Sequence, residues 1–517
     1  MTDTEAVIAG DTEKMAKVTT NPPKEESDIG DMVKYENGQD EALKYIHAIP
    51  VSYTEEEEIR VRRKIDMYML PWMCGLYLLQ YLDKTALSYA SSMGIKADTN
   101  MSASDYSMSG SIFYIGYLVF EYPHNRLMQR FPLGKYISLS VIVWGAILSA
   151  SAGTHNAAGV LAVRFFLGGL EGAVTAGFVL ITAQWYPLRD QALRSAIWFS
   201  FNGTSQIVGG VMAYAISKGF EDARYTFASW KAVFLVTGLV TAVYGMFMLY
   251  FMADSPITAR WLTEEEKSIA IDRLRGNQQG IGSRVFKWGQ FREAFTDIRT
   301  YLIFFFMVTV CIPCGGITVF FTQLIESFGF DSQTTFLLAI PGGFVEVVTM
   351  IGLAWTAQKI NNRMFCATLG QLGGLLGIAM MMGLSRHGIT NYPVGQLVGY
   401  YLVMGNSANA LLLVLSSISS NTAGYTKKTT VNAIALIGYC VGFLIGPQTY
   451  RAAPAYWDAK WTVVVMWTLA LVACLGLYWV NKRENERRDK LGLPPQREGE
   501  EFGDLTDGEN LYFRYSL

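Results

Sequence analysis

Long apolar runs separated by short polar stretches make up most of this chain. Runs such as "SIFYIGYLVF" and "WTVVVMWTLALVACLGLYWV" would be apolar on every side of a helix, which is typical of helices that lie in lipid. Stretches of about 20 residues can cross a bilayer as helices, whereas barrel strands give only weak alternating segments. We therefore predict twelve transmembrane helices. Their extents are 67–90, 107–128, 135–153, 158–183, 193–216, 230–252, 299–323, 334–357, 364–384, 394–418, 427–447 and 461–481.

The predicted spans fall into two groups of six. They define an N-terminal six-helix bundle at 66–252 and a C-terminal one at 299–481, joined by a polar central loop at 253–298. Polar segments flank them, an N-terminal arm at 1–65 and a C-terminal tail at 482–517. This layout predicts an all-α membrane protein with two six-helix repeats, as in secondary transporters.

Composition and charge narrow the functional classes. Hydrophobic residues make up 51% of the 517 residues, charged residues only 17%, and the net charge is −2. With no basic patch among stacking aromatics, we expect no nucleic-acid partner. The first sixty residues hold 15 Asp/Glu against 6 Lys/Arg, which predicts a disordered cytosolic arm. Lys and Arg are concentrated in alternate loops, and this places both termini in the cytosol.

The six cysteines all fall within predicted spans, including the pair in "CIPC" at 311–314. Metal or redox sites need polar partners and access, so we expect these cysteines to be buried and inert, with no metal and no cofactor. The cytosolic segments contain no metal cluster or nucleophile motif that would indicate a membrane enzyme.

Arg164 and Glu171 interrupt the fourth predicted span. A charge at the bilayer centre costs about 2.5–3.5 kcal/mol on insertion scales. Seven residues apart, the two lie within about 20° on one helix face, roughly 10 Å apart along the axis. Gly168 and Gly169 lie between them. We expect this face to line the interior of the protein, and Glu171 to compensate Arg164 across the glycines.

The first span carries a second charged pair, Asp83 and Lys84. One interpretation is that the pair ends the helix at the far interface, where Lys84 extends to water. Together with Arg164 and Glu171, however, it predicts a cavity with two cations and two carboxylates. Cations suit an anionic substrate, and a desolvated carboxylate can cycle a proton. This pattern predicts proton-coupled transport of an organic anion, with Asp83 and Glu171 as proton-coupling groups.

Further polar residues in the spans are candidates for substrate contacts, with helix–helix hydrogen bonding as the alternative. With Lys84 and Arg164, the candidate substrate-binding residues are Tyr77, Gln80, Asn202, Asn432 and Tyr439. Glu121 and Glu346 also lie in spans, where hydrogen bonding between helices is the favoured explanation. Pro313 predicts a kink, which either lines the cavity or packs statically.

Several motifs resemble those of the major facilitator superfamily, and within it the anion:cation symporters typified by fungal allantoate permeases. They include "NRLMQRFPLGKY", "RFFLGGLEGA", "SPITARWLTEEEK" and "SNTAGYTKKTTVNAI". The resemblance implies a proton-driven symporter of a small organic anion, of the allantoate or ureide, vitamin carboxylate or dipeptide type. In similar carriers the residues matching Asp83 and Glu171 couple protons, and those matching Lys84 and Arg164 serve substrate and gating.

Two departures from the family pattern stand out. Gln129 stands near a usually acidic position, and Lys84 stands where fungal relatives commonly have Arg. We expect a monomer in the plasma membrane. Two alternatives stay open. An efflux antiporter of drugs or metabolites usually has a Pro in the glycine run of span five, which is missing here. A non-transporting nutrient receptor would usually have a long signalling tail.

Overall fold

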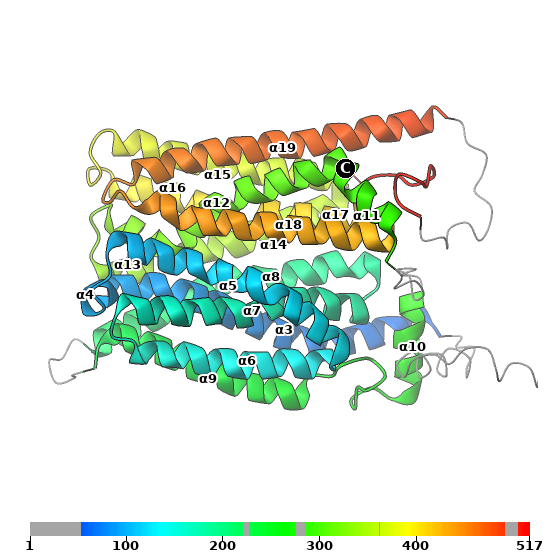
Figure 1. The fold of residues 1–517 in the computed structure, drawn as a ribbon, viewed down its shortest axis with the longest axis horizontal. Coiled ribbons are helices and arrows are strands. Elements are labelled where there is room, and N and C mark those ends of the chain that lie inside the picture. Colours follow the sequence, from blue (N-terminus) through cyan, green and yellow to red (C-terminus); the bar gives the residue numbers. More distant parts are fainter. Residues whose placement is uncertain (1–52, 221–226, 276–285, 361, 492–504, 517) are drawn as a thin grey trace, which may run out of the picture. The chain divides into compact units, whose positions relative to one another are not determined.

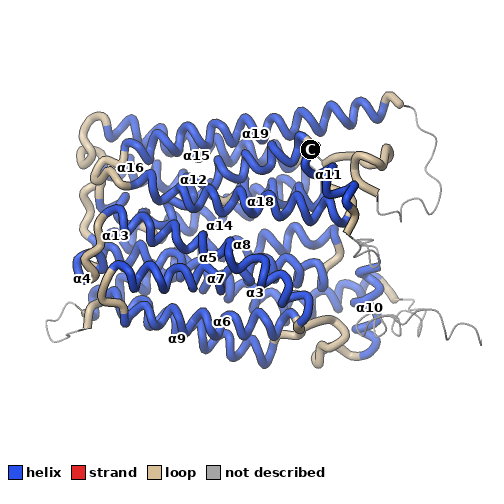
Figure 2. The backbone as a smooth tube through the Cα atoms, in the orientation of Figure 1, coloured by secondary structure: helices blue, strands red, loops and turns tan. Residues whose placement is uncertain are grey.

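The computed structural model describes residues 53–516 apart from 221–226, 276–285, 361 and 492–504. These residues form helices and loops without strands (Figure 2). Each predicted span corresponds to one helix or to two consecutive helices. The ten uninterrupted spans are α3 (Glu55–Ser92), α5 (Ala103–Arg130), α6 (Leu133–Ala150), α7 (Ala157–Trp185), α8 (Leu188–Gly219), α9 (Ser229–Phe251), α12 (Ile298–Glu326), α15 (Arg363–Ser385), α18 (Tyr425–Ile445) and α19 (Trp457–Asp489).

Two predicted spans are divided into consecutive helices. The span at 334–357 is α13 (Ser332–Leu338) followed by α14 (Ile340–Ile360), and the span at 394–418 is α16 (Pro393–Ser407) followed by α17 (Asn409–Asn421). At the second break, the carbonyl of Ser407 accepts a hydrogen bond from Cys314 Sγ of α12 at 3.1 Å. Breaks of this kind are tolerated in membrane helices because neighbouring helices satisfy the freed backbone groups.

The helices differ in how apolar they are. In the described part of the chain, nine helical stretches are long and apolar enough to cross a membrane by themselves. The other three spans are α3, α5 and α8. Each of them contacts a helix of the last six spans: α3 contacts α12, α5 contacts α18, and α8 contacts α14. The three less apolar helices of the first group therefore all pack against helices of the other group.

The first span extends beyond its predicted start. Helix α3 begins at Glu55, where Thr54 and Glu57 form a reciprocal capping box, a motif that satisfies two N–H groups at a helix start. The predicted disordered arm at 1–65 is therefore wrong for its last residues, which are helical. Residues 1–52 lie outside the described part, so the prediction for them stays untested, as do the other domain boundaries.

The central loop and the C-terminal segment lie at one end of the helices (Figure 1). Helices α10 (Glu264–Arg275) and α11 (Trp288–Thr296) belong to the predicted central loop, and the segment 505–516 lies near α11 at the same end. The short helix α4 (Ile95–Asp98) lies at the opposite end. The C-terminal segment is anchored to the helices, since Asn485 of α19 makes two hydrogen bonds with the backbone of Tyr515.

Candidate functional site

The four charged residues of the first and fourth spans lie together inside the protein. Lys84 Nζ lies 2.7 Å from Glu171 Oε1, and Arg164 Nη1 lies 3.8 Å from Asp83 Oδ1. We call these four residues the α3–α7 cluster. The prediction that Glu171 compensates the charge of Arg164 directly is wrong in this conformation. Glu171 pairs with Lys84 of α3, and Arg164 pairs with Asp83 of α3.

The interpretation that Asp83 and Lys84 end a helix at the interface is also wrong. Helix α3 continues to Ser92, and Asp83 and Glu171 are fully buried. Trp144 of α6 donates its indole N–H to Asp83 Oδ2 at 2.6 Å, and the Lys84 ammonium lies 5.9 Å from the ring centre of Phe113. Helices α3, α6 and α7 and the ring of Phe113 on α5 thus surround the two ion pairs.

The glycines between Arg164 and Glu171 are covered by another helix. A β-carbon on Gly168 would overlap the carbonyl oxygen of Phe113, and one on Gly116 would overlap that of Phe165. Helices α5 and α7 therefore touch through their backbones, an approach that only glycine permits. This contact explains the Gly168–Gly169 pair as a packing feature that sets the position of α7 beside α5.

Several polar atoms around the α3–α7 cluster have no hydrogen-bond partner among the described residues. They are Arg164 Nη2, Asp83 Oδ1, Glu171 Oε2 and both polar atoms of the Gln80 amide. Arg164 is only 4% exposed, so its guanidinium is buried with one distant ion pair. Buried polar groups are nearly always bonded, and a guanidinium can donate two parallel hydrogen bonds to a carboxylate. The cluster therefore has unused capacity to bind a polar ligand.

The other candidate residues lie at different distances from this cluster. Tyr77 and Gln80 are buried on α3, and the Tyr77 ring lies 4.8 Å from that of Trp198 on α8. Asn202 is one turn further along α8 and is 7% exposed. Helices α3 and α8 are packed together here, but no described contact joins Asn202 to the charged pairs.

The candidates on α18 approach from the last six spans. The ring of Tyr439 lies 6.0 Å from that of Tyr114 and 6.4 Å from that of Tyr117, both on α5. Asn432, two turns earlier on α18, is exposed. Tyr439 thus packs against α5, whereas nothing in the described residues brings Asn432 to the cluster.

Sequence reasoning missed Trp144, Phe113 and the tyrosines of α5. Trp144 had a usable signal, because a buried Trp in the middle of a span usually finds an acceptor for its N–H. Which acceptor it finds depends on the rotation of α6 against α3. The ring contacts of Phe113 and Tyr114 likewise depend on how closely α5 approaches its neighbours.

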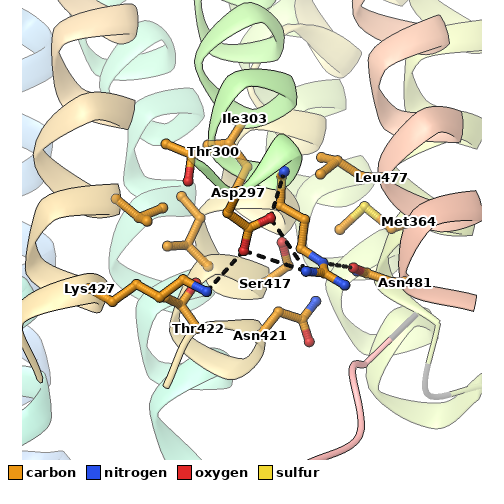
Figure 3. A pocket seen from close by; sticks show the side chains of 13 residues that line it. Asp297, Thr300, Ile303, Met364, Ser417, Asn421, Thr422, Lys427, Leu477 and Asn481 are labelled. Carbon is orange, nitrogen blue, oxygen red and sulfur yellow. Dashed lines mark hydrogen bonds and ion pairs between the residues drawn. The ribbon is translucent and has the colours of Figure 1, made fainter. Parts of the chain in front are cut away.

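A second charge cluster lies at the end of the helices near α11, and Figure 3 shows Lys427 and Asp297 of it. Lys427 Nζ lies 2.9 Å from Glu293, 2.9 Å from Asp297 and 2.8 Å from Asp507. We call these four residues the Lys427 cluster. The small cavity beside it is also lined by Arg299 and Asn481, whose side chains hydrogen-bond to each other at 2.9 Å.

The Lys427 cluster is held by the C-terminal segment. Asp507 also accepts hydrogen bonds from the Tyr515 hydroxyl and the Ala423 N–H. Arg488, 2% exposed, donates to backbone carbonyls of the same segment, including those of Asp507 and Phe513. Partners are present for the Lys427 ammonium, the Arg488 guanidinium and the Asp507 carboxylate. The cluster therefore stabilises the packing of the helix ends against the C-terminal segment.

Comparison with known proteins identifies the family. The model of the Major Facilitator Superfamily matches residues 73–447, more than half of the chain. The chain belongs to this superfamily. It is thus a multi-pass membrane transporter that moves a small molecule rather than an enzyme, and the fold of twelve transmembrane helices in two six-helix repeats is confirmed.

The relatives and structures of this superfamily agree with the assignment. An uncharacterized transporter of Schizosaccharomyces pombe is 43% identical over 499 residues, covering 95% of both chains. The allantoate permease of Saccharomyces cerevisiae is 36% identical over 512 residues, covering 94% of this chain and 92% of the permease. The xylose transporter of E. coli in a partially occluded inward-open conformation has a TM-score of 0.59 at 13% identity, covering 80% of this chain and 97% of the other; it shares the fold.

Proposed function

We propose that this transporter is a proton-coupled symporter of a small organic anion. The observation that carries the proposal is the α3–α7 cluster: two cations paired with two carboxylates in a buried setting, with the guanidinium of Arg164 incompletely bonded. Such a cluster is neutral overall when all four groups are ionised. An anion that enters adds one negative charge.

Charge balance gives the physical reason for coupling. An uncompensated buried charge is strongly unfavourable, so an anion bound at Arg164 favours uptake of one proton by Asp83 or Glu171. Protonation of Asp83 frees Arg164, and protonation of Glu171 frees Lys84, for contact with the anion. The loaded cluster is then neutral again and can pass through an occluded state.

Support for the substrate class comes from the residues and from a relative. Arg164 can form a forked pair with a carboxylate, and Gln80 adds an amide whose polar atoms lack partners. One relative covering most of the chain is named an allantoate permease. We therefore propose a carboxylate that also has hydrogen-bonding groups, of the ureide type, taken up across the plasma membrane by a monomer with both termini in the cytosol.

Transport by purified protein in vesicles tests the proposal. Uptake of labelled allantoate and of a panel of small carboxylates is measured with an inward proton gradient, an inward sodium gradient, or neither. We expect accumulation with the proton gradient alone and its loss on addition of a protonophore. Accumulation driven by sodium and indifferent to pH would contradict proton coupling, and preference for neutral or cationic analogues would contradict the anion assignment.

A further inference from the structure

Glu346 is a buried carboxyl that the proposed mechanism does not use. It lies in α14 and is 1% exposed, and its Oε2 has no hydrogen-bond partner among the described residues. No described Lys or Arg lies within ion-pair distance of it, in contrast to Asp83 and Glu171, which each have a cation nearby.

Among the described residues, no positive charge lies close enough to stabilise the ionised form of Glu346. Titratable side chains that interact electrostatically with it are Tyr81 of α3 and Cys314 of α12, and both are neutral groups. An isolated carboxylate in such a place is strongly unfavourable, and the usual result is that the group takes up a proton. The protonated form of Glu346 therefore fits the conformation seen here.

The position of Glu346 connects it to the movement of the carrier. One turn before it, Gly343 touches Gly203 of α8 through the backbone, since a β-carbon on either glycine would overlap the carbonyl oxygen of the other. Helix α8 belongs to the first six spans and α14 to the last six. Glu346 is thus buried at a contact between the two groups, and separation of these helices would expose it to water.

We propose that Glu346 is an additional proton-binding residue of the transport cycle. It holds a proton while α8 and α14 are in contact and releases it when they separate and water reaches the carboxyl. This inference rests on the proposed proton-coupled function and deepens it. It adds to the α3–α7 cluster of the first six spans a separate proton-binding position in the last six spans.

The number of protons moved with each substrate molecule tests this role. It is obtained from the membrane potential and pH gradient at which net flux stops, in vesicles with wild-type protein, Glu346→Gln or Glu326→Gln. Gln resembles the protonated side chain in shape and charge, so Glu346→Gln should fold and exchange substrate. We expect its ratio to be lower than that of the wild type by one proton. Glu326→Gln, near the end of α12, should keep the wild-type ratio.

A chemical readout separates a proton-binding role from a structural one. An apolar carbodiimide modifies protonated carboxyl groups in apolar surroundings, and mass spectrometry measures labelling of Glu346. We expect labelling to fall as pH rises and to change when substrate is added.

The possible results distinguish the two proposals. If substrate accumulation by the wild type does not depend on the proton gradient, both the proposed function and the role of Glu346 are contradicted. Proton-driven accumulation with an unchanged ratio in Glu346→Gln, or with labelling that depends on neither pH nor substrate, would contradict only the role of Glu346.

Discussion

The two buried charge clusters of this transporter differ in how completely their polar atoms are bonded. In the Lys427 cluster, the ammonium meets three carboxylates at 2.8–2.9 Å, which uses all three of its N–H donors. In the α3–α7 cluster, Arg164 has one ion pair at 3.8 Å and an unpartnered Nη2. Both clusters occupy buried positions, so burial alone does not separate them.

The degree of bonding distinguishes a cluster that stabilises the fold from one that can bind a ligand. A buried polar network with every member satisfied makes its surroundings rigid, whereas an incomplete one is unfavourable unless something else completes it. The Lys427 cluster joins α11, α18 and the C-terminal segment and has no need of a ligand. Under the proposed function, substrate and proton supply the partners that the α3–α7 cluster lacks. The predictions below test this division.

The largest effect is expected from Arg164→Ala. Removal of one partner of a buried charge pair at a binding interface costs about 2–5 kcal/mol, so we expect uptake to fall by about 30-fold or more. Lys at this position should restore little, because an ammonium lacks the forked geometry. Initial uptake rates per surface-exposed molecule provide the measurement, with Arg130→Ala at the exposed end of α5 as the control. Normal anion uptake by Arg164→Ala would make this residue structural.

Glu171→Gln should separate binding from coupling. The amide mimics the protonated carboxyl and leaves Lys84 free for the anion, so labelled substrate should still exchange across the membrane. Accumulation against a gradient should disappear, and exchange should depend only weakly on pH. Counterflow and net uptake are compared in the same vesicles at several pH values. Glu121→Gln, which removes a carboxyl paired with Asn125 rather than with a cation, is the matched control.

Two results would change this assignment. If Glu171→Gln still accumulates substrate with a proton gradient, the coupling role moves to Asp83. If the variant loses exchange as well as accumulation, Glu171 serves the fold or contacts the substrate itself.

Lys427→Met should affect stability more than transport. The substitution leaves the buried carboxylate of Asp507 without its cation and leaves Asp297 with Arg299 alone, and breaking a buried pair costs about 3–5 kcal/mol. We expect a lower midpoint of thermal unfolding in detergent, with a substrate Kd close to that of the wild type. Lys428→Met is the control, because Lys428 has no described ion pair. A changed Kd with unchanged stability would reverse the functions that we give to the two clusters.

The smallest effect concerns the acid sensitivity of the Lys427 cluster. Burial by itself would raise the pKa of Asp297, but the neighbouring Lys427 and Arg299 outweigh it and hold the pKa below the ordinary 3.8. A lowered pKa stabilises the folded state above the unfolded-state value, and this contribution is lost as pH falls through the folded-state value. The wild type should therefore be more stable than Asp297→Asn near neutral pH, and the difference should shrink below pH 3.8. A difference that does not vary with pH would contradict the ionic role of Asp297.

The amino-acid sequence alone was enough to predict the membrane fold and to single out the charged residues within the spans. Apolar runs of bilayer length predict helices because an unsatisfied backbone in lipid is so unfavourable. Charges within such runs indicate function because lipid does not tolerate them. Thr54 and Glu57 have the spacing of a capping box, which indicates the start of α3. The predicted disordered arm did not take this signal into account.

Which charged residues form ion pairs, and which polar atoms stay without a partner, depends on the tertiary structure. Arg164 and Glu171 share a face of α7, which made their mutual pairing the simplest expectation, yet each lies closer to a residue of α3. The backbone contact of α5 with Gly168 sets where α7 lies, and the rotation of α6 brings Trp144 to Asp83. Helical periodicity specifies the face on which a side chain lies, but its partner depends on contacts between helices that are distant in the sequence.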